Sequence, residues 1–324
     1  MPDARSTLAA PAIARIRAWV LGTFPREQEG IDYTRPAGDA GLFGPDSVTW
    51  RIHADFPGML AGGLCALMLQ TLHPRALAGV WDHSNFRGDL IGRLRRTTAF
   101  VAASSYAPRA EADAMITRVR AIHTRVRGST ADGVPYAADD PALLTWVHVT
   151  ESFGFLQGYR RYCRPVPQVM ADRYYAEVAR IARALGAREV PASEADVSTY
   201  LKAVRAELRC DARSREVLAV LGAIRLPVPM AGPSRRLFLG AGAALLPGWA
   251  LDLLGRGTLQ RTGDALAARS LATIAPLFRL ALHDGIAPRA CRRMGVEAEV
   301  LQRWPDIQPN VQSNIQPEAD MSPD

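Results

Sequence analysis

Residues 62–72, GGLCALMLQTL, form the stretch that decides the fold of this chain. Nearly every side chain in it is apolar, so a helix formed here has no polar face for solvent and must be buried on almost every side. His73-Pro74-Arg75 ends the run, because the residue before a proline is displaced from the helical region. We therefore expect a buried helix at the centre of the fold, leading directly into a polar segment.

The polar segment carries side chains that can transfer protons. Residues 81–86, WDHSNF, are typical of a short turn, with Asp82 and His83 inside it. Beyond the turn, residues recur every three or four positions, which places them on one face of a second helix. They are Asp89, Arg93, Arg96, Thr97 and Phe100. At least one guanidinium on this face should be half-buried, and since an unpaired buried charge is costly, we expect it to have a partner. For Arg93 the structural candidate is Asp89, one turn earlier, and the functional one is a ligand.

The composition indicates a helical globular protein. Of the 324 residues, 48% are hydrophobic and 7% aromatic, which favours helices over sandwiches and barrels. The net charge of +7 would permit an acidic partner, but no basic patch with interleaved aromatic residues is visible, so nucleic-acid binding is not expected. The four cysteines lie far apart, and charged residues interrupt the apolar runs near the N-terminus. Both features predict a cytoplasmic protein with free thiols.

We expect three parts: a helix and linker over residues 1–44, a main domain over 45–304 and a disordered tail over 305–324. The fold class predicted for the main domain is all-α, a single multi-helix domain. Further helices are expected at Leu8–Phe24, Ala110–Arg127, Ala142–Tyr162, Pro167–Leu185, Ser193–Leu208, Ser214–Ala223 and Leu266–Leu282, the last one kinked or divided at Pro276. Leu237–Leu254 approaches the length of a membrane span, but Pro247 and Asp252 interrupt it, which favours a buried helix pair.

The expected helix over residues 110–127 carries an apolar stripe with His123 beside it. The stripe consists of Ala112, Met115, Ile116, Val119, Ile122 and Val126. A neutral imidazole beside hydrocarbon is what an axial haem ligand requires, whereas a core histidine bonded to a carbonyl is the structural alternative. The flanking arginines are Arg118, Arg120, Arg125 and Arg127. They would suit haem propionates, because a guanidinium matches a carboxylate, although a solvated helix face fits them as well.

Motifs of serine hydrolases, P-loop proteins, dinucleotide-binding proteins and HExxH metalloproteases are absent. Two other functions stay open beside haem chemistry. His123, His148 and Glu151 could bind a non-haem iron, although a carboxylate-bridged di-iron bundle needs the His-x-x-Glu pair twice. A haem or lipid carrier without turnover would keep His123 and an apolar pocket.

Several motifs, in this order, resemble the MpaB and rubber oxygenase (latex-clearing protein) catalytic-domain family. They are His73-Pro74, Gly79-Val80 with His83-Ser84 and Phe86, Asp89, Arg93-Leu94 with Arg96-Thr97, Val119-Arg120 with His123 and Val126, Asp140-Pro141 with Trp146-Val147-His148, and Asp172-Arg173-Tyr174-Tyr175. The resemblance covers roughly residues 45–254. It implies a globin-like core, a non-covalent haem b and oxygenase chemistry with O2 or peroxide on a hydrophobic small molecule.

Matched by position, the resemblance implies that His123 is the proximal iron ligand and that Arg93 and Thr97 lie on the distal side. We expect further contacts to the cofactor from Arg96, Arg120, Arg127, His83 and His148. Rubber oxygenases have a distal lysine where this chain has Arg96, which cannot ligate a metal. They also use a distal glutamate as a base, and this chain has no glutamate between residues 31 and 110. Proton transfer would then fall to His73, Asp82 or His83, with His73 as the leading candidate.

Overall fold

The computed structural model describes residues 4–24, 30–224 and 231–306, and within them the chain is mostly helical. The helices are α1 (Ala4–Thr23), α2 (Val48–His53), α3 (Phe56–Gln70), α4 (Pro74–His83), α5 (Leu90–Tyr106), α6 (Arg109–His123), α7 (Pro141–Tyr162), α8 (Gln168–Leu185), α9 (Glu194–Ala203), α10 (Ala212–Ala223), α11 (Ala231–Ala243), α12 (Gly248–Leu253), α13 (Thr258–Ala281) and α14 (Ile286–Arg293), with 3-10 turns η2 (Val204–Glu207) and η3 (Ala298–Gln302). Two short strands, β1 (Arg127–Ser129) and β2 (Pro135–Ala137), pair antiparallel with Gly128 opposite Tyr136. The disordered tail predicted beyond residue 306 lies outside the described residues.

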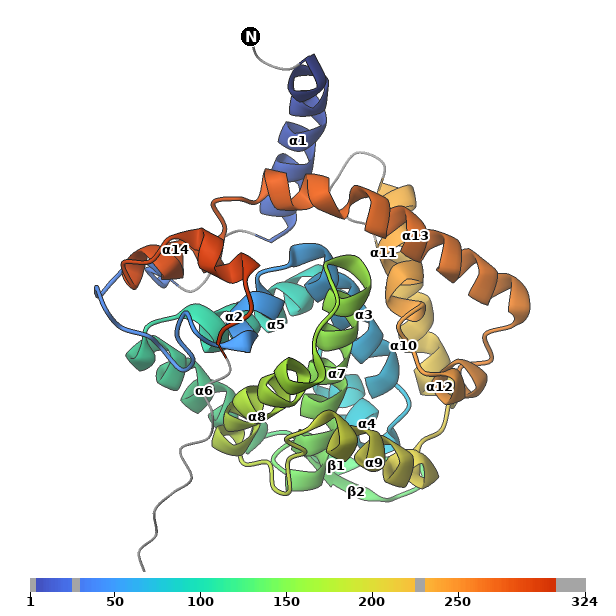
Figure 1. Ribbon diagram of the computed structural model, residues 1–324. Coiled ribbons are helices and arrows are strands. Elements are labelled where there is room, and N and C mark those ends of the chain that lie inside the picture. Colours follow the sequence, from blue (N-terminus) through green and yellow to red (C-terminus); the bar gives the residue numbers. More distant parts are fainter. Residues whose placement is uncertain (1–3, 25–29, 225–230, 307–324) are drawn as a thin grey trace, which may run out of the picture.

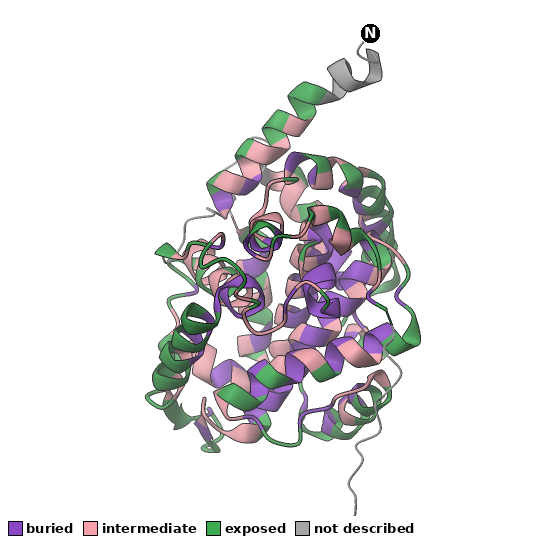
Figure 2. Cartoon of the chain, turned by 60° about the vertical axis from the view of Figure 1, so that its left-hand side comes forward, coloured by how far each residue is buried: buried purple, intermediate pink, exposed green. Residues whose placement is uncertain are grey.

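Helices α3 and α7 form the centre of the molecule, and the other helices surround them (Figure 1). Helix α13 crosses one end with α11 beside it, and α1 projects outward from that end. The junction of α1 with the body is fixed by Trp19, whose ring lies 5.6 Å from Phe238 and 5.5 Å from Phe278. Buried residues concentrate on the inward faces of the central helices (Figure 2).

Glycines bring α3 and α7 into direct backbone contact. Gly58 and Gly62 of α3 face Gly158 and Gly154 of α7, and a Cβ atom on Gly62 would overlap the carbonyl oxygen of Gly154. The reverse also holds, because a Cβ on Gly158 would overlap the carbonyl oxygen of Gly58. Only glycine permits so close an approach of two helices. The pair therefore depends on glycine at these positions.

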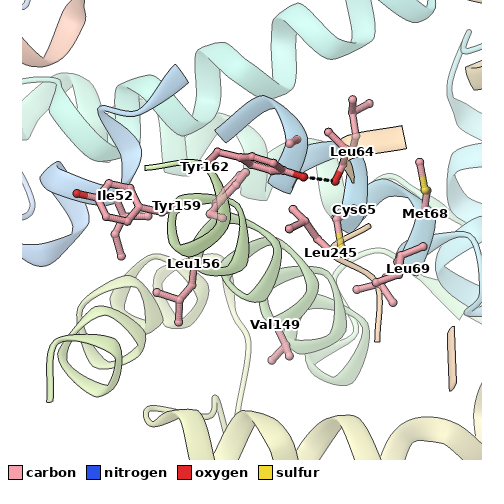
Figure 3. Close-up of a cluster of buried hydrophobic side chains, with 14 of the residues drawn as sticks. Ile52, Leu64, Cys65, Met68, Leu69, Val149, Leu156, Tyr159, Tyr162 and Leu245 are labelled. Atoms are coloured by element: carbon pink, nitrogen blue, oxygen red, sulfur yellow. Dashed lines mark hydrogen bonds between the residues drawn. The ribbon is translucent and has the colours of Figure 1, made fainter. Parts of the chain in front are cut away.

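Around this contact lies the main hydrophobic core (Figure 3). Helix α3 contributes Cys65 and Leu69, which are fully buried, as the apolar run in the sequence predicts. Helix α7 contributes Leu156 and Tyr162, and the Tyr162 hydroxyl donates a hydrogen bond of 2.6 Å to the carbonyl of Ala241. That bond joins α11 to the central pair. The four cysteines of the chain are free thiols.

Side-chain caps fix where the helices around the candidate site begin. Asp55 accepts a hydrogen bond from the backbone of Gly58 at the start of α3, and Asp89 accepts one from Gly92 at the start of α5. Asp140 accepts one from Ala142 at the start of α7, whose predicted bounds are confirmed to within one residue. An acidic cap satisfies amide groups that lack a helical partner and complements the helix dipole.

Three local predictions were wrong. Residues 81–83 are not a turn, because α4 continues through them to His83. Helix α6 ends at His123, so Arg127 and Gly128 lie in β1 and Ile122 is 52% exposed. Residues Arg127–Ser129 pair with Pro135–Ala137 as a strand, so the helix does not continue through them.

The C-terminal helices differ from expectation in a different way. The predicted pair over residues 237–254 is confirmed as α11 and α12, separated by a break before Gly248. Helix α13, however, begins at Thr258 and runs through Pro276 without division. In the described part of the chain, no single helix is both long and apolar enough to cross a membrane. Helices α13 and α14 meet both criteria only when they are taken together, and the chain bends by 46° between them.

Candidate active site

Helix α5 turns Arg93 inward and Arg96 outward. The Arg93 guanidinium is largely removed from solvent, and burial, followed by the charge of Arg96, lowers its pKa while Glu151 acts in the opposite direction. Arg96 is exposed and lies 3.6 Å from Asp89, so the acid expected to pair with Arg93 pairs with its neighbour. The Thr97 hydroxyl donates to the carbonyl of Arg93 at 3.2 Å. The two positions are only about 60° apart around the helix axis, but Arg93 lies at the edge that faces the protein and Arg96 at the edge that faces solvent.

Glu151 is the acidic group that faces Arg93, and it comes from α7. Apolar side chains surround its carboxyl, and this burial raises its pKa to about 7, with Arg93 lowering it in part. The sequence carries a signal for this residue that we did not use: Glu151 is the only charged residue between Pro141 and Tyr159. A single acid in an otherwise uncharged core helix is costly unless it has a partner or a function.

Two cavities lie beside α5, one bordered by α3 and α7 and the other also by α4 and α10. The middle cavity, about 120 Å³ in volume, is bordered by Thr97, Glu151, Gly63 and Phe155. The inner cavity, about 50 Å³, is bordered by Arg93, Leu90, Phe86 and Val147. Both are lined mainly by apolar side chains, and the charged residues among those that border them are Arg93 and Glu151. Helix α5 packs against α2, α6 and α14, which leaves room on its other side.

An outer cavity of about 210 Å³ continues this space towards α1 and α14. It shares Phe56, Met59 and Val101 with the middle cavity. Its wall includes His53, a buried residue whose Nε2 accepts a hydrogen bond from the Tyr174 hydroxyl at 3.0 Å.

His53 was not assigned a role from the sequence. Its Nδ1 lies 2.7 Å from Ser105 Oγ, which itself donates to the carbonyl of Val101, so Nδ1 carries the proton. Burial lowers the pKa of His53 to about 3. A neutral imidazole with both nitrogens engaged inside the protein is a structural part of the wall.

His123 and His148 are neutral histidines with a buried nitrogen that forms no hydrogen bond within the described residues. At the end of α6, the atom is Nδ1 of His123, and on α7, one turn before Glu151, it is Nε2 of His148. Burial lowers the pKa of His123, and burial with the nearby charge of Arg183 lowers that of His148 to about 4. A buried polar atom without a partner is costly, and it is often a site for a ligand.

His73 and His83 lie elsewhere. His73 occupies the N-cap position of α4 without a capping hydrogen bond, and its buried Nδ1 also has no partner within the described residues. Its ring lies 5.8 Å from that of Trp146, and its Nε2 is 3.5 Å from Glu207. Burial lowers the pKa of His73, and Glu207 acts in the opposite direction. His83 is exposed, with Nε2 3.1 Å from the carbonyl of Arg127. Neither borders the middle or the inner cavity.

The remaining predicted positions lie at the surface. Arg120 is exposed, and Arg127 pairs with Asp139 at 2.8 Å. Asp82 accepts a hydrogen bond of 2.6 Å from the Tyr136 hydroxyl. The structure thus places Thr97 and Glu151 on the middle cavity and Arg93 on the inner one. The other predicted positions border neither cavity: Arg96, Arg127, His73, His83, His123 and His148.

Within residues 4–24, 30–224 and 231–306, no three His, Cys, Asp or Glu side chains gather closely enough to hold a metal ion. His123, His148 and Glu151 are therefore not assembled as a triad. A haem differs from such a site in taking one protein nitrogen, because the porphyrin supplies the four equatorial nitrogens.

Comparison with known proteins gives one family. Residues 50–280 match the family described as "ER-bound oxygenase mpaB/B'/Rubber oxygenase, catalytic domain". The match covers most of the chain and includes all the side chains that border the middle cavity on α3, α5 and α7. The same comparisons find no match among curated proteins and none among solved structures.

Proposed function

Because the chain belongs to the MpaB/rubber oxygenase catalytic-domain family, we propose that it is a haem b-dependent oxygenase whose substrate is an apolar small molecule. Membership of an oxygenase family supports enzymatic activity in general. The haem, the roles of individual residues and the substrate class are the content of the proposal.

His123 is the residue that would hold the haem iron. It is neutral, it has a buried nitrogen without a partner, and it ends a helix beside α5. When bound, haem would supply the binding and reductive activation of dioxygen, which no amino-acid side chain provides. His148, with its own unpartnered nitrogen, is the second imidazole available to such a cofactor.

The raised pKa of the buried Glu151 carboxyl is the observation that supports the proposed chemistry. A carboxyl with a pKa near 7 can both accept and return a proton at neutral pH, which is the property of an efficient general acid–base group. Glu151 thereby replaces His73, Asp82 and His83 as the proposed proton-transfer group, and it borders the same cavity as Thr97. Its position on α7 accounts for the missing glutamate between residues 31 and 110.

Arg93 supplies a positive charge that acts electrostatically on this carboxyl. A guanidinium that is already oriented stabilises negative charge developing on an oxygen atom without reorganisation. It also holds the Glu151 pKa below the value that burial alone would produce. The apolar walls favour a substrate that is mostly hydrocarbon, since each polar group placed there would lose its hydration.

Absorption spectroscopy of the purified protein tests the haem assignment. Wild-type protein should show a Soret band, alone or after haem addition, and His123→Ala should keep its circular dichroism while losing most of the band. His83→Ala is the matched control, because His83 is exposed, and it should keep the band. Wild-type protein that shows no Soret band after haem addition and removal of unbound haem contradicts haem dependence, and normal haem content in His123→Ala contradicts the ligand.

A further inference from the structure

The middle and inner cavities are separated by two side chains of α3. Leu67 and Gln70 border both cavities, so together they form the wall between them. Gln70 is held in place, because its Nε2 donates to Thr150 Oγ1 at 3.0 Å and that hydroxyl donates to the carbonyl of Val147. Leu67 is only partly buried in the core and is the part of the wall without hydrogen bonds.

Three polar side chains on the outer side of this wall already donate hydrogen bonds within the protein. Thr98 donates to the carbonyl of Leu94 at 2.8 Å, and the Tyr106 hydroxyl donates to the carbonyl of Trp50 at 2.8 Å. His53 is engaged at both nitrogens. The remaining lining of the outer and middle cavities is mainly apolar, with the Glu151 carboxyl as the charged group of the middle cavity, so these cavities favour an aliphatic chain.

The two charged groups that border these cavities lie on opposite sides of the wall. Glu151 borders the middle cavity and Arg93 borders the inner one, so the boundary at Leu67 lies where the chain of a ligand would meet them. A chain that enters past Phe56 and Met59 follows α3 until it reaches Leu67.

We infer that Leu67 limits the length of the aliphatic chain that this protein accepts. The inference rests on the proposed apolar substrate and adds the residue that sets how far the substrate enters. Removing the Leu67 side chain joins the inner cavity, about 50 Å³, to the middle one and lets a longer chain enter.

A homologous series of linear primary alcohols, from hexanol to tetradecanol, tests this inference by displacement of the uncharged dye N-phenyl-1-naphthylamine. For wild-type protein, each added methylene should tighten binding about fourfold until the chain reaches the wall, and then binding should level off. In Leu67→Ala the affinity should continue to rise for about two further carbons, because the ligand can then occupy both the inner cavity and the volume of the removed side-chain atoms. Leu67→Val should give a smaller extension and serves if Leu67→Ala folds poorly.

Val80→Ala is the matched control, because Val80 borders only the inner cavity and leaves the wall intact. It should level off at the wild-type chain length. The same plateau in Leu67→Ala or Leu67→Val as in wild type, an equal extension in Val80→Ala, or the absence of alcohol binding at any length would each overturn the inference. The proposed haem chemistry is judged separately, by the Soret band of the same preparations.

Discussion

The two sides of helix α7 are built in opposite ways. Towards α3, glycines remove every side-chain atom and the backbones touch, with no room for a ligand. Towards α5, the same helix borders cavities and carries Glu151, a buried acid with a raised pKa. The tight side, which faces α3, fixes the position of the helix. The open side, which faces α5, can then hold a buried charge that lowers the stability of the fold. We therefore expect substitutions on the two sides to affect different properties.

Substitution on the tight side should have the largest effect. Gly62→Ala and Gly158→Ala place a methyl group on the backbone of the facing helix, so the helices must separate and the core must shift. We expect a loss of about 4 kcal/mol or more in the free energy of unfolding, measured by urea denaturation. Gly222→Ala in α10 is the control, since nothing lies within 4 Å of its added Cβ, and it should be neutral or stabilising. Equal losses in all three variants would refute the importance of the α3–α7 contact.

Glu151→Gln tests the open side through its dependence on pH. The folded state keeps the Glu151 proton up to a pKa of about 7, whereas the unfolded state releases it near the ordinary glutamate pKa of 4.5. Between these values the folded state binds more protons, so the Glu151 contribution to stability falls as pH rises. The neutral variant should lack this fall and exceed wild type by about 3 kcal/mol at pH 8, relative to pH 4.

Urea unfolding of both proteins across this pH range provides the measurement. The difference between them removes the contribution of His148, which has the opposite sign. The pKa of His148 is lowered to about 4, so its contribution is lost as pH falls from about 6.5 to 4. A constant difference between wild type and Glu151→Gln would contradict the raised pKa.

Arg93→Leu should have a smaller effect on the same profile. Without the guanidinium the pKa of Glu151 should rise further, so the loss of stability should extend to higher pH than in wild type. Asp89→Asn should leave the profile in place, because Asp89 pairs with Arg96 and an asparagine still caps α5. If both variants shift the profile equally, Arg93 belongs to the Asp89 ion pair and not to the cavity.

Arg96→Ala should have the smallest effect. Arg96 is exposed, and an exposed ion pair at 3.6 Å contributes at most about 0.5 kcal/mol. Haem content should also be unchanged, in contrast to the cofactor contact expected from the sequence. A clear fall in the Soret band of this variant would show that Arg96 reaches the cofactor despite its outward position.

Most of the architecture could be predicted from local sequence. The apolar run at residues 62–72 predicted a buried helix, and Asp140 with Pro141 predicted the start of α7. These signals depend on hydrophobic pattern and capping, which act within one helix. The signal for the tight contact was present but unused: Gly154 and Gly158 repeat the spacing of Gly58 and Gly62.

The candidate site could be predicted only in part. The sequence indicated that at least one guanidinium of residues 93–96 would be half-buried and would need a partner, because an arginine within an apolar helix cannot remain unpaired at low cost. It could not determine which acid, because Asp89 lies nearby in the sequence while Glu151, 58 residues away, approaches only when α5 folds over α7. Local pattern fixes which face of a helix is buried. Only the packing of distant helices decides which charges meet, and whether the space between them is filled or left open.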